Sequence, residues 1–280
     1  MACWFQCPKC GKALWETEKT WCCDNGHTYD RSRAGYVNLL PPSGKSNHGD
    51  DKPMVQARRS FLEKGYYGCL AEAVCQTAAL LAPDDCTILD AGCGEGYYTR
   101  AVYQTLMQSR KNVRMMAVDL SKNALMLAAR TVPDIAWAAA SVYALPVANQ
   151  CADLVLDLFS PLADREYRRV LKPGGYLIYA IPLRDHLFSL KTALYERPYL
   201  NPEQDLLLDG FTLTDRKEIR REIHLTCGED VRNLFTMTPY YHKTSPADRQ
   251  KLERISDLTT QAAFGLLIYQ RNFEDADGEE

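Results

Sequence analysis

The hydrophobic pattern of the chain alternates between strand-like and helical segments after about residue 85. Mainly apolar runs of strand length occur at five places, 87–91, 115–119, 135–140, 151–159 and 176–182. Helical spacing of apolar residues appears between the first three runs, at 99–109 and 121–132, and a polar segment separates the last two. Strands that alternate with helices predict an α/β protein with a parallel, doubly wound sheet.

Further elements flank this alternating region on both sides. Two segments with helical periodicity, 54–65 and 69–82, precede it and are separated by glycines. Two strand-like segments follow it, at 211–226 and 261–273, and we expect them to close the sheet as antiparallel strands.

The beginning of the chain follows neither pattern. Residues 1–35 are rich in Cys, Trp, Gly and charged side chains, which is typical of a small hairpin module organised by a metal. Residues 41–53 consist mainly of Pro, Gly, Ser and charged residues, the composition of an exposed linker. We therefore divide the chain into a module at 1–40, a linker and connecting helix at 41–65, and an α/β domain at 66–280.

Composition narrows the class of protein without naming a function. The 280 residues are 46% hydrophobic and 25% charged, as in globular proteins, and no apolar stretch is long enough to span a membrane. The first thirty residues are too charged for a signal peptide, so we expect a cytoplasmic protein with no membrane partner. Eleven cysteines, an odd number, then indicate reduced thiols and metal ligands rather than disulfides.

Charge gives only a weak indication of a partner. The net charge is −3, but residues 1–66 carry 10 Lys and Arg against 7 Asp and Glu. A mildly basic front end is compatible with contact to RNA, and equally with an ordinary solvated surface.

A glycine-rich loop follows the first predicted strand. Asp90 ends the strand, and Gly92, Gly94 and Gly96 alternate before the next helix, with Glu95 between the last two. A turn without Cβ atoms lets a ligand lie against the backbone. The spacing is not that of a dinucleotide fingerprint, and the two acids would repel a phosphate. They suit a ligand with a sulfonium and an amino group, which predicts S-adenosylmethionine.

Later strand ends complete this predicted cofactor site. Asp119 ends the second strand, where a carboxylate accepts both ribose hydroxyls of adenosine cofactors. Ser141 follows the third strand, where the adenine edge would lie. Residues 157–161 end the fourth strand, where the methyl acceptor would lie. These features and the segment 171–182 resemble class I methyltransferases over roughly residues 66–272.

A set of four ligands for zinc lies in the N-terminal module. Cys7 and Cys10 form a C-x2-C pair, and Cys23 and His27 form a C-x3-H pair twelve residues later. Two such pairs supply a closed tetrahedral site, which is structural because no position remains for water or substrate. Cys22 in place of Cys23 would give a C-x4-H pair and also remains possible; packing beside a tryptophan is its other reading.

The order of these motifs resembles one family. The zinc ribbon is followed by Gly-Tyr-Val-Asn-Leu-Leu at 35–40, by Met-x-x-Ala-Arg-x-x-Phe-Leu at 54–62, and by the methyltransferase core. In this order they look like the bacterial guanine-N1 methyltransferases of 23S ribosomal RNA, over about residues 3–270.

The resemblance implies several roles. It implies that Cys23 rather than Cys22 is the third zinc ligand, and that Tyr67, the loop at Gly94 and Glu95, and His186 hold the cofactor. It implies methylation of a guanine in a hairpin loop of domain II, and a homodimer whose zinc modules at 1–40 line a cleft for RNA.

Methyl transfer to guanine N1 adds a requirement for a base, because that nitrogen carries a proton that must leave. Asp157 and Asp164 are the candidates, at and just beyond the fourth strand. Phe159 is a candidate for stacking on a base extruded from its loop. Arg58 and Arg59 are candidates for phosphate contacts, or else charges on the surface of their helix.

Two other functions stay open from the residues alone. One is a methyltransferase for a small-molecule acceptor whose zinc ribbon takes no part in activity. The other is a protein that binds RNA or the cofactor in ribosome assembly without catalysis. The presence of Asp90, Glu95 and Asp119 argues against a decayed cofactor site.

Overall fold

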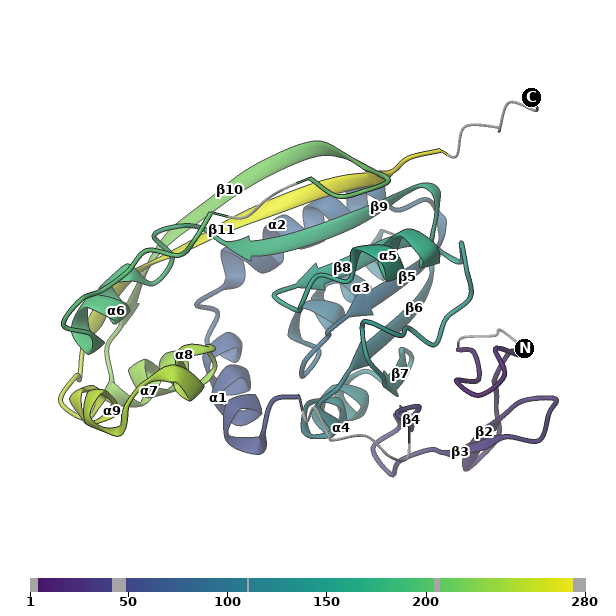
Figure 1. Ribbon diagram of the computed structural model, residues 1–280, viewed down its shortest axis with the longest axis horizontal. Coiled ribbons are helices and arrows are strands. Elements are labelled where there is room, and N and C mark those ends of the chain that lie inside the picture. Colours follow the sequence, from purple (N-terminus) through teal and green to yellow (C-terminus); the bar gives the residue numbers. More distant parts are fainter. Residues whose placement is uncertain (1–4, 42–48, 110, 204–206, 274–280) are drawn as a thin grey trace.

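The computed structural model describes residues 5–41, 49–109, 111–203 and 207–273, and places a small hairpin module beside a large twisted sheet (Figure 1). Of the predicted linker, residues 42–48 lie outside the described residues. The module contains three short antiparallel strands, β1 (Trp15–Glu16), β2 (Thr20–Cys22) and β3 (Thr28–Asp30).

The large sheet has eight strands in the order β10-β11-β9-β8-β5-β6-β7-β4. Their bounds along the chain are Val37–Asn38 (β4), Asp85–Ala91 (β5), Asn112–Asp119 (β6), Ala136–Ala139 (β7), Ala152–Leu158 (β8), Leu171–Pro182 (β9), Phe211–Leu225 (β10) and Leu258–Arg271 (β11). The strands from β9 to β4 are parallel, while β11 pairs antiparallel with β9 and with β10. The structure thus confirms the predicted doubly wound sheet and its two closing antiparallel strands.

Nine helices lie in the described part of the chain: α1 (Lys52–Glu63), α2 (Gly68–Leu81), α3 (Tyr97–Gln108), α4 (Lys122–Thr131), α5 (Asp164–Val170), α6 (Phe188–Leu194), α7 (Gly228–Thr236), α8 (Tyr240–Lys243) and α9 (Pro246–Leu252). None of them is both long and apolar enough to cross a membrane. The sequence did not predict α6 to α9, because helices of four to nine residues are too short to show a clear period.

Both faces of the central strands of the sheet are buried, so these strands point apolar side chains in two directions, whereas the edge strand β10 is mostly exposed. On β5, Ile88 joins the core formed with α2, α3 and α4, while its neighbour Leu89 joins a second core on the opposite face. That second core contains Tyr167 and Val170 of α5. It also contains the apolar residues of the N-terminal module. The module therefore covers part of this face of the sheet, as α2, α3 and α4 cover the other face.

The module is joined to the sheet in three ways. Phe5 and Trp21 are buried in the same core as Leu145, and the N–H of Gln6 donates to the carbonyl oxygen of Pro146 at 2.7 Å. In addition, β4 pairs in parallel with β7 and extends the sheet by one strand. The segment predicted to end a separate module at residue 40 is thus part of the sheet of the α/β domain.

We predict that replacing Phe5 with alanine lowers the free energy of unfolding of the whole chain by about 3–5 kcal/mol. Phe5 has no exposed surface and contacts Trp21, with 5.7 Å between ring centroids. Urea denaturation of the zinc-saturated protein, followed by circular dichroism, measures the change. As a control, Leu80→Ala removes a side chain that is 79% exposed and is expected to change stability by less than about 0.5 kcal/mol. A main transition that does not move in the Phe5 variant would show that module and sheet unfold independently.

Candidate functional site

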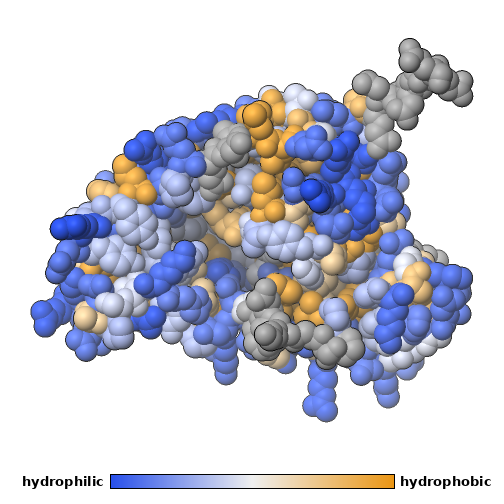
Figure 2. All heavy atoms as spheres, viewed as in Figure 1, coloured by the Kyte–Doolittle hydropathy of each residue, from blue (hydrophilic) through white to orange (hydrophobic). Residues whose placement is uncertain are grey.

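The candidate site lies at the point where the order of the strands reverses. From β5 the chain proceeds outward through β6 and β7, and then crosses back to β8 on the other side of β5. The segments that follow β5 and β8 lead to helices on opposite faces of the sheet, α3 and α5. Open α/β sheets bind ligands at such a point, at the carboxyl ends of the strands. Figure 2 shows the surface hollowed between the lobe that carries α7, α8 and α9 and the body of the sheet.

The glycine loop after β5 has the conformation that its sequence requires. Gly92, Gly94 and Gly96 all have positive φ, at 87°, 55° and 82°. A Cβ on Gly92 would collide with the side chain of Ser160, and one on Gly96 would lie 3.0 Å from Ala128 Cβ. Other residues are strained at all three angles, and at Gly92 and Gly96 they also have no room. At Gly94 a Cβ would meet only Arg58 Nη1, at 3.8 Å, so the backbone stays bare at this point of the loop.

Asp90 lies beneath this loop and not on its surface. Its side chain is buried, and the hydroxyl of Thr99 donates to Oδ2 at 2.6 Å. Burial raises the pKa of Asp90 to about 7, against the opposing effect of that hydrogen bond. Asp90 thus joins the end of β5 to the start of α3, and holds the loop from below.

Asp119 joins the loop to the end of β6. The N–H of Gly94 donates to its Oδ2 at 2.9 Å, and the N–H of Ser121 donates to its Oδ1 at 2.7 Å. Burial raises the pKa of Asp119, while these backbone donors lower it. Each oxygen still has one lone pair free of these two bonds, so the carboxylate fits a ligand with two adjacent hydroxyls, such as a ribose.

Helix α1 brings the two adjacent arginines to different surroundings. Arg58 forms an ion pair with Asp50 and donates to the carbonyl oxygen of Met237 at 3.3 Å. Its side chain is 25% exposed and faces the glycine loop. Arg59 points outward and pairs with Glu63 at 2.8 Å.

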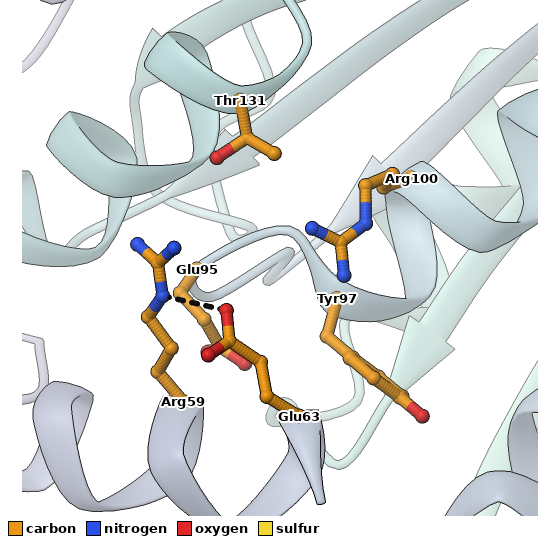
Figure 3. Close-up of a pocket in the computed structure, with 6 residues that line it drawn as sticks. All are labelled: Arg59, Glu63, Glu95, Tyr97, Arg100 and Thr131. Atoms are coloured by element: carbon orange, nitrogen blue, oxygen red, sulfur yellow. Dashed lines mark hydrogen bonds and ion pairs between the residues drawn. The ribbon is translucent and has the colours of Figure 1, made fainter. Parts of the chain in front are cut away.

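Arg59 lines a shallow pocket on the helix side of the glycine loop. The other residues that line the pocket are Glu63, Glu95, Tyr97, Arg100 and Thr131, and Figure 3 shows Arg59 and Arg100 on either side of Glu63. The loop therefore has an outer side with paired charges here, and an inner side toward the cleft.

Aromatic rings pack together behind the end of β8 and form an almost fully buried aromatic wall. Tyr67 packs edge-on against Phe264, with 4.8 Å between centroids, and His186 lies 4.7 Å from the same ring. The N–H of Ala263 donates to Nδ1 of His186 at 3.1 Å, so the proton of the neutral ring is on Nε2, which lies 3.4 Å from the Tyr67 hydroxyl. Burial lowers the pKa of His186 to about 4, so it is uncharged near pH 7.

Phe159 continues this wall and is held by a strained turn. Its φ is +72°, unusual for an aromatic residue, and its ring lies 5.6 Å from Phe264 while 43% of it is exposed. Asp157 organises the turn: its Oδ1 accepts from the N–H of Ser160 at 3.0 Å and its Oδ2 from the hydroxyl of Tyr167 at 2.8 Å. Strain at an exposed ring beside a cleft is a sign of function.

The two acids proposed as a general base are placed differently. Asp157 has no exposed surface, and burial raises its pKa to about 7 despite its hydrogen bonds to Tyr167 and Ser160. Asp164 is half-buried as the first residue of α5. Ser141 follows β7, and its hydroxyl accepts from the N–H of Tyr143 at 3.2 Å.

The module brings together the four side chains predicted to bind zinc. The ligand atoms of Cys7, Cys10, Cys23 and His27 lie within 4.8 Å of one another. Nδ1 of His27 lies 3.4 Å from Sγ of Cys7 and 3.5 Å from Sγ of Cys23, and the sulfurs of Cys10 and Cys23 are 3.7 Å apart. Bond lengths of about 2.3 Å to sulfur and about 2.0 Å to nitrogen, at tetrahedral angles, require separations of about 3.5–3.8 Å. The donor set therefore fits zinc.

Cys22 is outside this group. It lies on β2, where its Sγ is 4.0 Å from the carbonyl oxygen of Trp15. The hydroxyl of Tyr29, 3.1 Å from Cys7 Sγ, is placed to donate to that sulfur once it is a thiolate and so to orient the ligand, a contact that the spacing of the cysteines did not predict.

Three parts of the site were missed from the sequence. Phe264 lies in an apolar run and carries no polar signal, and Thr99 and Tyr167 read as ordinary helix residues. The position of Arg58, by contrast, could have been predicted from the sequence. It lies four residues after Met54 and three before Phe61, both buried, and hence on the apolar face of α1.

Comparison with known proteins agrees with both parts of the structure. The model of a family described as the N-terminal part of RlmA matches residues 5–48, and a model described as a methyltransferase domain matches residues 88–175. Geranyl diphosphate C-methyltransferase from Streptomyces coelicolor A3(2) superposes with a TM-score of 0.44 at 14% identity, covering 73% of this chain and 76% of that one.

Two curated relatives share more of the sequence. A 23S rRNA (guanine(748)-N(1))-methyltransferase from Streptomyces fradiae is 36% identical over 195 residues, 68% of each chain. A Bacillus subtilis (strain 168) protein, provisionally named as a 23S rRNA (guanine-N(1)-)-methyltransferase, is 30% identical over 89% of this chain and 90% of its own length. The protein is a methyltransferase that uses S-adenosylmethionine and carries a structural zinc module. By this similarity the chain belongs to the family of 23S rRNA (guanine-N1)-methyltransferases.

Proposed function

We propose that the protein transfers a methyl group from S-adenosylmethionine to N1 of a guanine in a hairpin loop of domain II of 23S ribosomal RNA. The observation that carries the proposal is the similarity to the Streptomyces fradiae enzyme, whose name states a guanine and its N1. The zinc cluster and the glycine loop, in one chain and in the order of that family, support it.

The chain's own residues divide the binding of the cofactor between them. S-adenosylmethionine, when bound, supplies an activated methyl group on a sulfonium. The bare backbone at Gly92, Gly94 and Gly96 leaves room for its amino acid part, and Asp119 accepts the ribose hydroxyls. Ser141 lies after β7 beside the adenine edge.

Other groups shape the electrostatics of the same site. Glu95 places negative charge near the sulfonium and amino group of the cofactor, and Asp90 contributes by holding the glycine loop from below. Tyr67 and the neutral His186 form the wall between cofactor and acceptor. An uncharged imidazole is suited to this place because a second cation would repel the sulfonium.

The acceptor base is proposed to lie against Phe159. Its ring is exposed, aromatic and fixed by the strained turn after β8, so it can stack on a guanine extruded from the loop. Holding the nucleophile against the methyl carbon lowers the barrier through position alone. The removal of the N1 proton is assigned to Asp157 or Asp164. Oδ2 of Asp157 accepts only from Tyr167 and keeps a lone pair, but the side chain has no exposed surface, so its use as a base requires the turn after β8 to open.

The zinc module is proposed to grip the RNA, and the protein to act in the cytoplasm as a homodimer whose modules line the cleft for RNA. The mildly basic segment 1–66 supports the contact with RNA. The closed set of three cysteines and one histidine gives the metal a structural role. The methylated nitrogen therefore lies at Phe159 and not at the metal.

Transfer of label from S-adenosylmethionine to unmodified 23S RNA is the first test. We expect one labelled nucleotide, mapped to N1 of a guanine in the domain II hairpin, and the same measurement on ribosomal particles shows which form is the substrate. Label at another atom, or on a small molecule but on neither RNA form, would contradict the proposed function.

Asp119→Ala is expected to weaken the binding of S-adenosylhomocysteine by about a hundredfold or more, because two hydrogen bonds to a charged group, of about 1.5–3 kcal/mol each, are lost. Isothermal titration measures the affinity, and thermal melting checks that the variant is folded. Asp134→Ala, which removes an exposed acid before β7, serves as the control and should bind as the unaltered protein does. Equal affinities of the two variants would remove Asp119 from the site.

Cys23→Ser is expected to release zinc, while Cys22→Ser keeps one ion per chain. Of the two adjacent cysteines, only Cys23 has its sulfur among the four ligand atoms. Cys22→Ser is a matched control because it makes the same substitution at the neighbouring position. Metal analysis of the purified variants measures the difference. Loss of zinc from the Cys22 variant alone would reverse the assignment.

A further inference from the structure

Arg58 is an arginine directed into the protein, although its neighbour Arg59 points outward. Its guanidinium is held by the carboxylate of Asp50, in the segment before α1, and by the carbonyl oxygen of Met237 at the end of α7. A Cβ built on Gly94 would lie 3.8 Å from Arg58 Nη1. The guanidinium thus lies against the cofactor loop, between two segments that are far apart in the sequence.

Three carboxylates surround this one guanidinium. Asp50 is its direct partner, and Glu95 and Asp119 are close enough to act on it electrostatically. The segment that carries Asp50 also packs on the end of β6, because the hydroxyl of Ser121 donates to the Asp50 carbonyl oxygen at 2.6 Å. An arginine among three acids is therefore positioned to balance the charge of the two that the cofactor needs.

The balance is visible in each acid. Burial raises the pKa of Glu95 and of Asp119, and in both cases Asp50 raises it further while Arg58 lowers it. The backbone also lowers each pKa, through Ser121 and Gly94 for Asp119. Without Arg58, burial and the repulsion between the acids would still raise the pKa of Glu95 and of Asp119, and only the backbone hydrogen bonds would lower it.

The other charged side chains around α1 are engaged elsewhere. Lys64 pairs with Asp230 of α7, and Arg59 pairs with Glu63, on the outer side of the loop (Figure 3). His242 of α8 lies 3.0 Å from the sulfur of Met54. On α3, Arg100 lies beside Tyr97 in the outer pocket.

We propose that Arg58 is a positioning residue of the cofactor site, whose guanidinium ties helix α1 and the segment of Asp50 to the glycine loop and supplies positive charge beside Asp119 and Glu95. The inference rests on the proposed roles of Asp119 and Glu95. It is an alternative to the phosphate contact considered from the sequence, because the guanidinium already holds Asp50 and the Met237 carbonyl.

The test measures the binding of S-adenosylhomocysteine by isothermal titration between about pH 6 and about pH 8.5. Without Arg58 the two carboxyls bind protons at higher pH, and a protonated carboxyl is a poorer acceptor for the ribose. Arg58→Gln is therefore expected to bind about tenfold more weakly at the low end and to recover toward the unaltered protein as pH rises. Arg58→Lys should restore most of the low-pH affinity, and Arg59→Gln is the matched control and should leave the profile unchanged.

A second variant tests the opposite sign. Asp50→Asn removes the acid that repels Asp119 and Glu95, so its affinity should depend less on pH than that of the unaltered protein. It decides the question if Arg58→Gln does not fold, as judged by thermal melting. Lower affinity of Asp50→Asn at low pH would overturn the proposal.

The remaining outcomes are equally distinct. A loss in Arg58→Gln that is the same at every pH, or no loss, would also overturn the proposal. Normal cofactor binding with weaker binding of 23S RNA in Arg58→Gln would restore the phosphate contact. If Asp119→Ala does not change the affinity of the otherwise unaltered protein, the proposed cofactor site itself fails, and RNA labelling tests the reaction separately.

Discussion

The carboxylate of Asp119 is the point on which the cofactor side of the molecule depends. It accepts backbone N–H groups from Gly94 and from Ser121, and thereby fixes a loop after one strand to the end of the next. A half-buried charge is tolerated only where donors surround it. Gly94 donates to this carboxylate, and the segment before α1 packs on the same end of β6 through Ser121. The guanidinium of Arg58 lies close enough to act on the charge electrostatically.

Metal and sheet share the task of stabilising the N-terminal module. A module with three strands of two or three residues buries too little surface to fold alone, and the zinc ligands supply what is missing. The structure adds a second support, because Phe5, Leu14 and Trp21 are buried against the sheet. A ribbon that covers a face of the catalytic domain is an integral part of it, which argues against the reading in which the ribbon is dispensable.

The sequence predicted those parts of the site in which neighbouring residues carry the signal. The glycine loop, Asp119 and three of the zinc ligands follow from spacing, because each set lies in one or two short segments. Spacing left Cys22 and Cys23 both open, and the family resemblance favoured Cys23. The aromatic wall does not, because Tyr67, His186 and Phe264 come from three distant segments. Phe264 reaches His186 only through the register that pairs it with Pro182 across β11 and β9. Whether Arg58 or Arg59 faces the glycine loop depends on which side of α1 is apolar. The spacing of the buried residues Met54 and Phe61 places Arg58 on that side, but two adjacent arginines look alike in the sequence.

The short strand β4, through its pairing with β7, has a consequence for how the chain folds during translation. Its partner β7 is about a hundred residues further along, so the ribosome makes the module first and its docking surface some 5–20 s later, at about 5–20 residues per second. During that interval Phe5 and Trp21 have no sheet to cover them. Zinc captured early would keep the nascent ribbon ordered while it waits, so that availability of the metal during translation, and not only in the finished enzyme, sets the yield of folded chain.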